Sequence, residues 1–544
     1  MQDAAENPAP NLADRVHRAA LEYGDRPALH WREQSITWSE MDAAVDAAAR
    51  GLAAVAPHTR PGDPPPRVAI ALPNTPDFVI GLLGALRAGL VAVPVNPGFT
   101  APELRHVLAD SGTSVLLGTD RIRGLAAEVS AGLPALTAVH GAPPRPAAEA
   151  PEPTPHPRRG GDDLAVLLYT SGTEGHPKGA MLSHRALLAN HEQVDRIEPP
   201  VVGPTDTVLL ALPLFHAYGL NSGLGAVVHH GATGVLLDEP GPTAGLDEIA
   251  RHRVSVLIGV PSMFLAWAGA ATARAATASV RIAVCGAAPL DPAVAARFTA
   301  TTGHPVHVGY GLTETAPVLT STLVGGVAKA GSIGRPLPGV RLRLVDAAGA
   351  DLWRDGLTVP DDDPDELDIS DIAPGTDPGQ IVVAGPNLFA GYWPDGRDGP
   401  DADGWWGTGD IAYADSDGDL FLVDRLGELI LVNGFNVYPH EVELVLAGHP
   451  GVAESAVLGV PHPRTGETVR AYVVPAPGRP VTGEELLTHC ARNLARFKCP
   501  TVVEFVDALP HSAIGKVRKT QLRSATPAGP PADADTRTEV TDVH

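Results

Sequence analysis

The sequence predicts an α/β protein whose largest part is built from doubly wound parallel sheets. In the first third of the chain, short β-branched runs alternate with helical patterns, as in residues 67–72, 76–89 and 91–95. Strand–helix–strand alternation is typical of parallel sheets that are covered by helices. The chain has 544 residues, of which 44% are apolar, so it is long enough for at least two domains with large cores.

The alternation continues through the middle of the chain, where further short apolar runs are bounded by turn residues. Each run has the length and the Val, Ile and Leu content of a buried strand. We therefore expect two doubly wound sheets in a large N-terminal domain, with further strands at 114–117, 164–169, 207–212, 234–237, 256–259 and 279–284.

The pattern changes after Gly331, where strands become shorter, turns become frequent and helical patterns become rare. This indicates a small β-rich subdomain that ends near Asp424 and includes an acidic surface loop at 361–371. From Pro439 an independent pattern of helix, strand, strand, helix and strand predicts a smaller α+β domain. The predicted organisation is an N-terminal extension (1–11), a large domain (12–424), a hinge (425–427), a mobile C-terminal domain (428–524) and a disordered tail (525–544).

Charge and cysteine content exclude several classes of protein. The formal net charge of −23 does not fit a nucleic-acid binder, because such proteins carry a basic surface. The three cysteines form no metal or disulfide pattern. The N-terminus has no signal peptide, and the most apolar stretch, 78–95, is interrupted by Arg87, Gly89 and Pro94. These features predict a cytoplasmic protein without a membrane span.

One segment has the composition of an anion-binding loop. It follows the buried strand expected at 164–169 and runs from Tyr169 to Ala180 with the sequence YTSGTEGHPKGA. Glycines and small hydroxyl residues let backbone N–H groups surround a phosphate, and a lysine adds positive charge. The candidate phosphate-binding residues are Thr170, Ser171, Gly172, Thr173, Gly175 and Lys178. Taken alone, the segment also fits an ordinary glycine-rich turn.

Six further segments follow in order: LPLFH ending at His216, GYGLTE ending at Glu314, TGD ending at Asp410, Asp424-Arg425, GFNVYP ending at Pro439, and Gly515-Lys516. With the loop, they resemble the motifs of the adenylate-forming superfamily, which includes acyl-CoA synthetases, firefly luciferase and the adenylation domains of peptide synthetases. The resemblance extends from about Leu12 to Arg523. The run LILVNGFNVYP is similar to bacterial fatty acyl-CoA synthetases.

The resemblance implies an enzyme that uses ATP and Mg²⁺ to convert a carboxylic acid to an acyl-adenylate and then transfers the acyl group to coenzyme A. It implies that Lys178 holds phosphate, Glu314 binds Mg²⁺ and Thr313 contacts the α-phosphate. Asp410 would accept the ribose hydroxyls and Arg425 would assist. The implied adenine site is formed by Gly286, Ala287, Ala288, Gly309, Tyr310 and Gly311.

The resemblance also assigns residues to the chemical step and to the thiol route. Lys516 is implied to be the mobile catalytic lysine, although a lysine in such a basic stretch is usually a solvated surface residue. Asn433, Gly434 and Asn436 are implied in cofactor binding, with Gly434 beside the thiol channel. His216 is implied in the acyl site, although a buried structural histidine also fits.

The expected acyl pocket contains Ala217, Tyr218, Gly219, Met263 and Phe264. These residues are apolar or small, which favours an apolar and most simply a fatty acid. Two alternatives remain open: an acyl-adenylate synthetase that loads a carrier protein, and a catalytically inactive nucleotide sensor on the same fold. The oligomeric state and the chain length of the acid are not determined by the sequence.

Overall fold

The computed structural model describes residues 10–59, 63–145, 156–170, 177–238, 242–325, 328–358, 375–425, 428, 430–432, 435–462, 466–494, 496–511, 517–519 and 521–522. Contacts divide the chain into two compact units with a boundary between Leu429 and Ile430. The acidic loop at 361–371, most of the predicted hinge and the predicted tail lie outside the described residues. The domain limits that we inferred from the sequence therefore stay predictions.

The first sheet of the larger unit has six strands in the order β6-β5-β3-β4-β7-β8. Its strands pair in parallel except for β8, which pairs antiparallel with β7. These strands are β3 (Arg67–Ala71), β4 (Val91–Pro94), β5 (Val115–Gly118), β6 (Ala138–His140), β7 (Leu164–Thr170) and β8 (Lys178–Ser183).

The second sheet has nine strands in the order β15-β14-β13-β12-β11-β9-β10-β1-β2. Its central strands pair in parallel, and β2, β14 and β15 pair antiparallel at its two edges. These strands are β1 (Pro27–Trp31), β2 (Gln34–Thr37), β9 (Thr207–Leu210), β10 (Thr233–Leu236), β11 (Val256–Gly259), β12 (Ile282–Cys285), β13 (Val306–Gly311), β14 (Val318–Ser321) and β15 (Arg335–Pro336).

Side-chain alternation explains how one core serves both sheets. Val68 and Ile70 of β3 lie in the same buried cluster as Val208 and Leu210 of β9, while the intervening Ala69 and Leu209 face separate clusters on the outer faces. Because strand residues alternate between faces, each sheet is apolar on both sides and needs helices on both. The two doubly wound sheets expected from the sequence are therefore confirmed.

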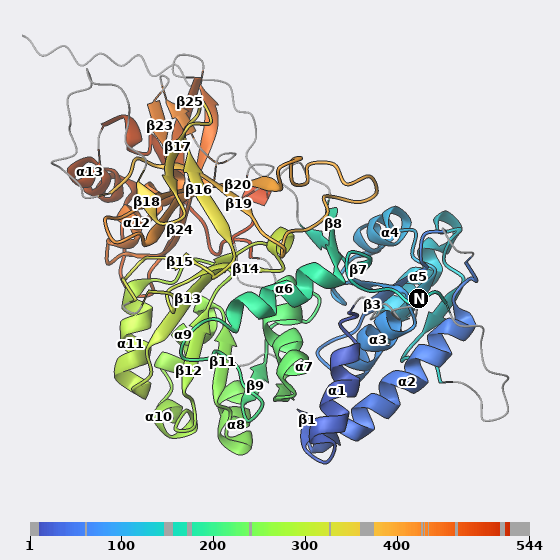
Figure 1. Ribbon diagram of the computed structural model, residues 1–544. Helices are drawn as coiled ribbons and strands as arrows, with labels where there is room; N and C mark the ends of the chain where they lie inside the picture. Colours follow the sequence, from blue (N-terminus) through green and yellow to red (C-terminus); the bar gives the residue numbers. More distant parts are fainter. Residues whose placement is uncertain are drawn as a thin grey trace, which may run out of the picture. The chain divides into compact units, whose positions relative to one another are not determined.

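The helices of the larger unit cover these faces, and α6 and α7 lie between the two sheets (Figure 1). Two of them begin at capping residues: Thr37 forms a capping box with Glu40, and Ser183 accepts from the N–H of Ala186. The helices are α1 (Asp14–Tyr23), α2 (Trp38–Val55), α3 (Pro76–Arg87), α4 (Ala101–Asp110), α5 (Asp120–Val129), α6 (His184–Val194), α7 (Ala226–His230), α8 (Pro242–His252), α9 (Pro261–Ala268), α10 (Ala273–Ala276) and α11 (Pro292–Thr302).

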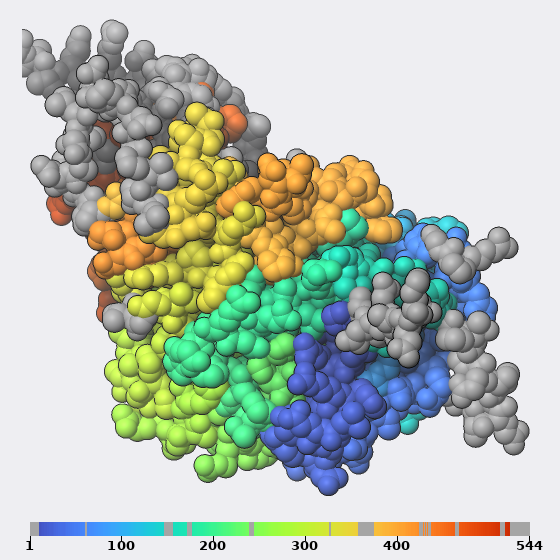
Figure 2. All heavy atoms as spheres, in the orientation of Figure 1, coloured from blue at the N-terminus to red at the C-terminus, as the bar shows by residue number. Residues whose placement is uncertain are grey.

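A third sheet of the larger unit is the β-rich part predicted after Gly331. It has the strand order β18-β17-β16-β19-β20-β21. The orange stretch before β20 lies against the teal stretch that contains β8 (Figure 2), in agreement with the bridge between Ala180 and Tyr392. Its strands are β16 (Arg341–Val345), β17 (Asp351–Arg354), β18 (Leu357–Thr358), β19 (Gly379–Ala384), β20 (Trp405–Ala414) and β21 (Leu420–Arg425).

The smaller unit is an α+β structure with its own core. After a short hairpin, its elements follow the predicted order of helix, strand, strand, helix and strand. They are β22 (Ile430–Val432), β23 (Phe435–Val437), α12 (Pro439–Ala447), β24 (Val452–His462), β25 (Gly466–Pro475), α13 (Gly483–Asn493) and β26 (Val502–Phe505). Among the helices described in either unit, none is both long enough and apolar enough to cross a bilayer.

Candidate active site

Tyr310 and Asp410 meet between two sheets of the larger unit. Tyr310 lies on β13, Asp410 lies on β20, and the tyrosine hydroxyl donates to Asp410 Oδ2 at 2.6 Å. The Asp410 backbone N–H donates to Thr408 Oγ1 at 3.1 Å, and only 5% of the Asp410 surface is exposed. Two of the predicted nucleotide-binding residues, 100 positions apart, are therefore in direct contact.

A second contact group joins Lys178, Tyr392 and Glu314. The hydroxyl of Tyr392 donates to Glu314 Oε1 at 2.6 Å. Lys178 Nζ lies 5.5 Å from the centre of the Tyr392 ring and 3.6 Å from Asp398 Oδ2. The tyrosine thus lies between the predicted phosphate-binding lysine and the predicted metal-binding carboxylate.

Glu314 belongs to a tight turn that is held by buried asparagines. The turn begins with a short 3₁₀ helix, Thr313–Thr315, and Gly311 precedes it where a Cβ would lie 1.7 Å from the Pro317 carbonyl oxygen. Only glycine fits such a close backbone approach. This requirement gives a structural reason for the second glycine of the GYG motif.

Three asparagine side chains donate to the backbone of this turn, and we call them the asparagine clamp: Asn190, Asn221 and Asn387. Their Nδ2 atoms donate to the carbonyl oxygens of Val318 at 2.8 Å, Ala316 at 2.7 Å and Thr315 at 2.8 Å, respectively. Each asparagine is at most 3% exposed. Because buried amides keep strong hydrogen bonds, the clamp fixes the turn that positions Thr313 and Glu314.

Helix α6 supports the asparagine clamp from one side. His191 Nε2 lies 3.0 Å from Asn221 Oδ1, and Gln193 Nε2 donates to Asn387 Oδ1 at 3.0 Å. Burial lowers the pKa of His191 to about 3, with further lowering from His229 and His230. His191 is therefore neutral, and its Nε2–H donates to Asn221.

Gly286, Tyr218 and Cys285 form an apolar wall beside the predicted adenine segment. A Cβ at Gly286 would lie 2.9 Å from Tyr218 Cζ, so the glycine lets the aromatic ring approach the backbone. The Tyr218 hydroxyl is buried without a hydrogen-bond partner among the described residues, and burial raises its pKa. Burial also raises the pKa of Cys285, which ends β12. Ala287 has a φ of +68° and turns the chain after Gly286.

The predicted acyl pocket is only partly assembled in this conformation. The π-helical turn η2 (Tyr218–Gly225) begins with Tyr218 and Gly219, and Ala217 directly precedes it. Met263 is half-buried on α9. His216 is also half-buried, and its Nδ1 lies 3.3 Å from the Tyr218 backbone nitrogen.

Phe264 departs from the expectation. It has 0% exposure and packs against Trp267 and Phe298 with ring centres 5.7 and 5.1 Å away. Consecutive residues of an α-helix point about 100° apart around its axis, so Phe264 lies on the core side of α9 while Met263 stays half-buried. In this conformation Phe264 supports the predicted acyl pocket from its buried side, and it has no exposed surface that a substrate can contact.

The phosphate loop is anchored by its two ends. Thr170 and Lys178 face each other across the β7–β8 ladder, and Thr170 Oγ1 donates to the Lys178 carbonyl at 3.5 Å.

The structure does not describe the side chains of two predicted site residues, Arg425 and Asn436. The remaining predicted residues lie outside the described part of the chain: Ser171, Gly172, Thr173, Gly175, Asn433, Gly434 and Lys516.

Sequence reasoning missed Tyr392, Asp398 and the asparagine clamp. No local motif surrounds the clamp residues, because they come from α6, η2 and the chain before β20 and meet only in the folded protein. The Tyr392-Trp393 pair, which follows a glycine in a loop, offered a weak signal, because an exposed loop rarely keeps two aromatic residues without packing or binding.

Parallel strands, a lysine-bearing hairpin, an acidic turn and a buried aspartate define a class of nucleotide-using α/β enzymes. The chain belongs to the AMP-binding enzyme family: the family matches residues 16–393, and the AMP-binding enzyme C-terminal domain matches residues 441–516. It is therefore an acid–thiol ligase of the ATP-dependent acyl-CoA ligase type, and the resemblance inferred from the motifs is confirmed.

Similar proteins with different named acids align along most of the chain. A feruloyl-CoA synthase from Amycolatopsis sp is 38% identical over 90% of this chain and 94% of its own length. A long-chain-fatty-acid–CoA ligase from Escherichia coli O157:H7 is 34% identical over 94% of each. The ATP-bound structure of MatB from Rhodopseudomonas palustris superimposes with a TM-score of 0.82 at 31% identity, covering 95% of this chain and 98% of that one.

Proposed function

We propose that this enzyme activates an apolar, most simply fatty, carboxylic acid as an acyl-adenylate and transfers the acyl group to coenzyme A. The observation that carries the acid class is the apolar wall that the described pocket residues offer, with Ala217, Tyr218 and Gly219 together at the start of η2 and Met263 half-buried on α9. An acid with a second charge would be poorly solvated against such a wall. Phe215-His216 likewise offers no carboxylate to pair with a substrate ammonium.

The nucleotide roles follow from the contacts around Asp410 and Tyr310. The Asp410 carboxylate has two oxygens and can accept from both ribose hydroxyls. The hydrogen bond from Tyr310 fixes the orientation of the carboxylate and of the aromatic ring at once. The ring would then stack on the adenine, next to the segment 286–288.

The phosphate end would be held by Lys178 and Glu314. A buried carboxylate whose orientation is fixed by Tyr392 fits Mg²⁺, which prefers hard oxygen ligands. When bound, this ion neutralises charge on the departing pyrophosphate. Thr313 would contact the α-phosphate, and Lys178 would hold the outer phosphates from the end of the β7–β8 hairpin.

Lys516 would stabilise the charge that develops while the carboxylate oxygen attacks the α-phosphorus and pyrophosphate leaves. In the second step the thiol of coenzyme A loses its proton, its sulfur attacks the acyl carbon and AMP leaves. Gly434, Asn433 and Asn436 would border the route of the thiol. His216 would lie beside the acyl group, next to Ala217 and Met263.

The relatives support two kinds of apolar acid. Their names specify feruloyl and long-chain fatty acyl groups, and a benzoate CoA ligase from Burkholderia xenovorans LB400 superimposes with a TM-score of 0.79 at 26% identity over 94% of this chain. An aromatic acid is therefore the second candidate substrate.

A panel of acids tests the proposal. Purified enzyme would be assayed for pyrophosphate exchange into ATP and for AMP release with coenzyme A, using saturated fatty acids of graded length, benzoate, ferulate, malonate and amino acids. We expect activity with apolar acids and a dependence on Mg²⁺. A preference for malonate or an amino acid would overturn the acid class. Exchange without transfer to coenzyme A would favour a carrier protein as acceptor, and no exchange with any acid would favour the inactive sensor.

A further inference from the structure

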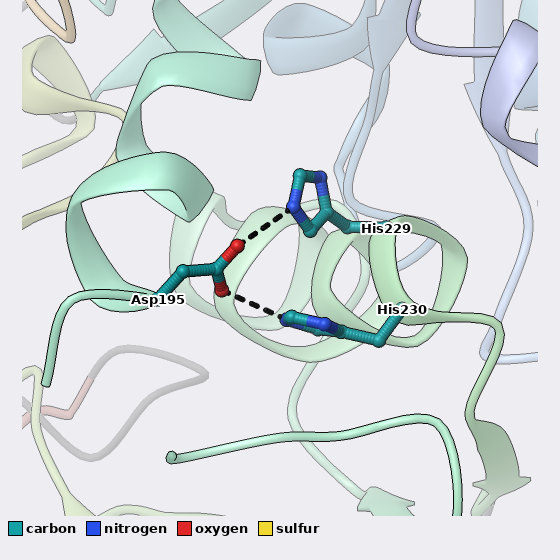
Figure 3. A group of neighbouring side chains, drawn as sticks. All are labelled: Asp195, His229 and His230. Carbon is teal, nitrogen blue, oxygen red and sulfur yellow. Dashed lines mark hydrogen bonds and ion pairs between the residues drawn. The ribbon is translucent and has the colours of Figure 1, made fainter. Parts of the chain in front are cut away.

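Asp195, His229 and His230 form a cluster in which both histidine rings point to the carboxylate of Asp195 (Figure 3). His229 Nε2 lies 3.0 Å from Asp195 Oδ2, and His230 Nε2 lies 3.1 Å from Asp195 Oδ1. One ligand atom from each of the three side chains lies within 4.8 Å of those of the other two. We propose that this cluster is a binding site for a zinc-like transition-metal ion, distinct from the Mg²⁺ site proposed at Glu314.

The ligand types select the class of metal. Two imidazole nitrogens and one carboxylate suit Zn²⁺ and neighbouring transition metals, whereas Mg²⁺ prefers an all-oxygen octahedron. Zinc bonds to nitrogen and oxygen of about 2.0–2.2 Å place tetrahedral ligand atoms about 3.3–3.6 Å apart. The observed separations of 3.0 and 3.1 Å need only a small opening to reach that range.

The local charge favours a cation. Asp195 follows the last residue of α6, and His230 is the last residue of α7, so two helix C-termini with their partial negative charge converge on the cluster. Across the described residues, the ion pairs found for Asp195 involve only these two histidines. The negative charge is therefore not balanced by a lysine or an arginine, unlike that of Asp206, which pairs with Arg281.

The histidine rings can present their Nε2 lone pairs. Metal binding would use the Nε2 lone pair of each ring and place the ring N–H at Nδ1. The Nδ1 atom of His229 is buried and, within the described structure, has no hydrogen-bond partner that would block this tautomer. The site is also reachable, because the Asp195 side chain is 36% exposed while the His229 and His230 side chains are 8% and 17% exposed.

Metal titration of the whole enzyme tests the proposal. Protein stripped with a chelator would be titrated with Zn²⁺ in excess Mg²⁺ by calorimetry, and with Co²⁺ by visible absorption. We expect one site that Mg²⁺ does not occupy, with the Co²⁺ bands of a four- or five-coordinate ion. The Asp195→Asn, His229→Gln and His230→Gln variants should each bind at least about tenfold more weakly, the scale on which a metal site responds to loss of a supporting group.

His17→Gln is the matched control. His17 contacts Asp42 at 2.8 Å, but Arg87 also pairs with that carboxylate at 2.7 Å, so no further cation is needed there. Zn²⁺ affinity should be unchanged in this variant. Thermal unfolding of every variant identifies any that fail to fold. Equal weakening by His17→Gln, or unchanged binding in folded His229→Gln and His230→Gln proteins, would mean that zinc binds only to scattered surface histidines and would overturn the proposal.

Discussion

The hydroxyl of Tyr310 is 2.6 Å from Asp410 Oδ2, and this hydrogen bond connects β13 of the nine-stranded sheet to β20 of the β-rich sheet. Because Asp410 is 5% exposed, the tyrosine orients a carboxylate that has little freedom to reorient in water. The contact therefore couples the ribose side of the proposed nucleoside site, at Asp410, to its adenine side, at Tyr310.

Asp410→Asn should raise the KM for ATP by about 10- to 100-fold, because a neutral amide loses a charge-assisted hydrogen bond of about 1.5–3 kcal/mol to the ribose. Tyr310→Phe should cause a smaller rise, because the ring is kept and only the orienting hydroxyl is lost. Steady-state kinetics with saturating acid measure both changes. Tyr413→Phe is the control, since its ring stacks on Phe421 with centres 5.1 Å apart. An unchanged KM in Asp410→Asn would contradict the ribose role.

Asn221→Asp should impair use of ATP as well as stability. The variant keeps the side-chain shape but loses the donor to Ala316, and it places a carboxylate against two backbone carbonyls, those of Leu187 and Ala316. We expect a loss of about 2–4 kcal/mol in the free energy of unfolding. We also expect a higher KM for ATP, because the turn that carries Glu314 loosens.

Asn11→Asp provides the matched control for Asn221. Asn11 is also buried, and its Nδ2 donates to two carbonyl oxygens, those of Leu86 and Arg159, each at 2.9 Å. Both variants should melt at lower temperature, but only Asn221→Asp should change the KM for ATP. If the two variants changed KM equally, Asn221 would have a structural role alone.

Lys516→Ala and Gly434→Trp should damage different half-reactions. Loss of the lysine removes a charge that is needed while the acyl–phosphate bond forms, so adenylation should fall by at least ~10²–10³ while thioester formation from supplied acyl-AMP is largely kept. Gly434→Trp should block the thiol route and spare pyrophosphate exchange. Single-turnover assays of each step make the comparison. If both variants lost the same step to the same extent, separate roles of Lys516 and Gly434 in the two steps would be ruled out.

The stability of the smaller unit should fall in acid through Glu443. Burial would raise the pKa of this carboxyl, but hydrogen bonds from His440, Lys519 and the Val457 N–H and the charge of Lys519 outweigh it and lower the pKa. The stabilisation is present above the unfolded pKa of about 4.3 and is lost as pH falls through the lower folded pKa. Hydrogen exchange of β24 and β25 from neutral to acidic pH measures this loss.

Glu443→Gln should remove much of that acid dependence and lower stability near neutral pH by about 1–3 kcal/mol, because Lys519 loses its carboxylate. Glu454→Gln is the control, since Glu454 is 40% exposed at its side chain and pairs with His511 near the surface. Its effect on exchange should be small. A Glu443→Gln protein with the same acid profile as the unmodified enzyme would contradict this account.

Periodicity and turn residues predicted most of the fold of this enzyme. The strand expected at 256–259 has those bounds, and the helix expected at 76–89 ends two residues earlier, at Arg87. The strand expected at 207–212 ends at Leu210, where the Asn74 side chain donates to the carbonyls of Leu210 and Leu212. A distant side chain of this kind leaves no local signal.

The candidate site was predictable only where a motif carried it. The GYG and TGD segments located Tyr310 and Asp410, but their hydrogen bond depends on how two sheets pack. Tyr392 and the asparagine clamp had no such motif, and the pairing of Asp195 with His229 and His230 joins the ends of two helices 34 or more residues apart. Sequence reasoning therefore named candidate residues but not the contacts between them.

The burial of Cys285 has a consequence for chemical selectivity. An acyl-adenylate reacts with thiolates, and Cys285 directly precedes the segment 286–288 proposed to border the nucleotide. Burial raises its pKa, so the side chain stays a thiol, which is a poor nucleophile. The enzyme can therefore carry a cysteine beside the segment proposed to border the nucleotide without that side chain acting as a nucleophile, and the acyl group is kept for the incoming cosubstrate.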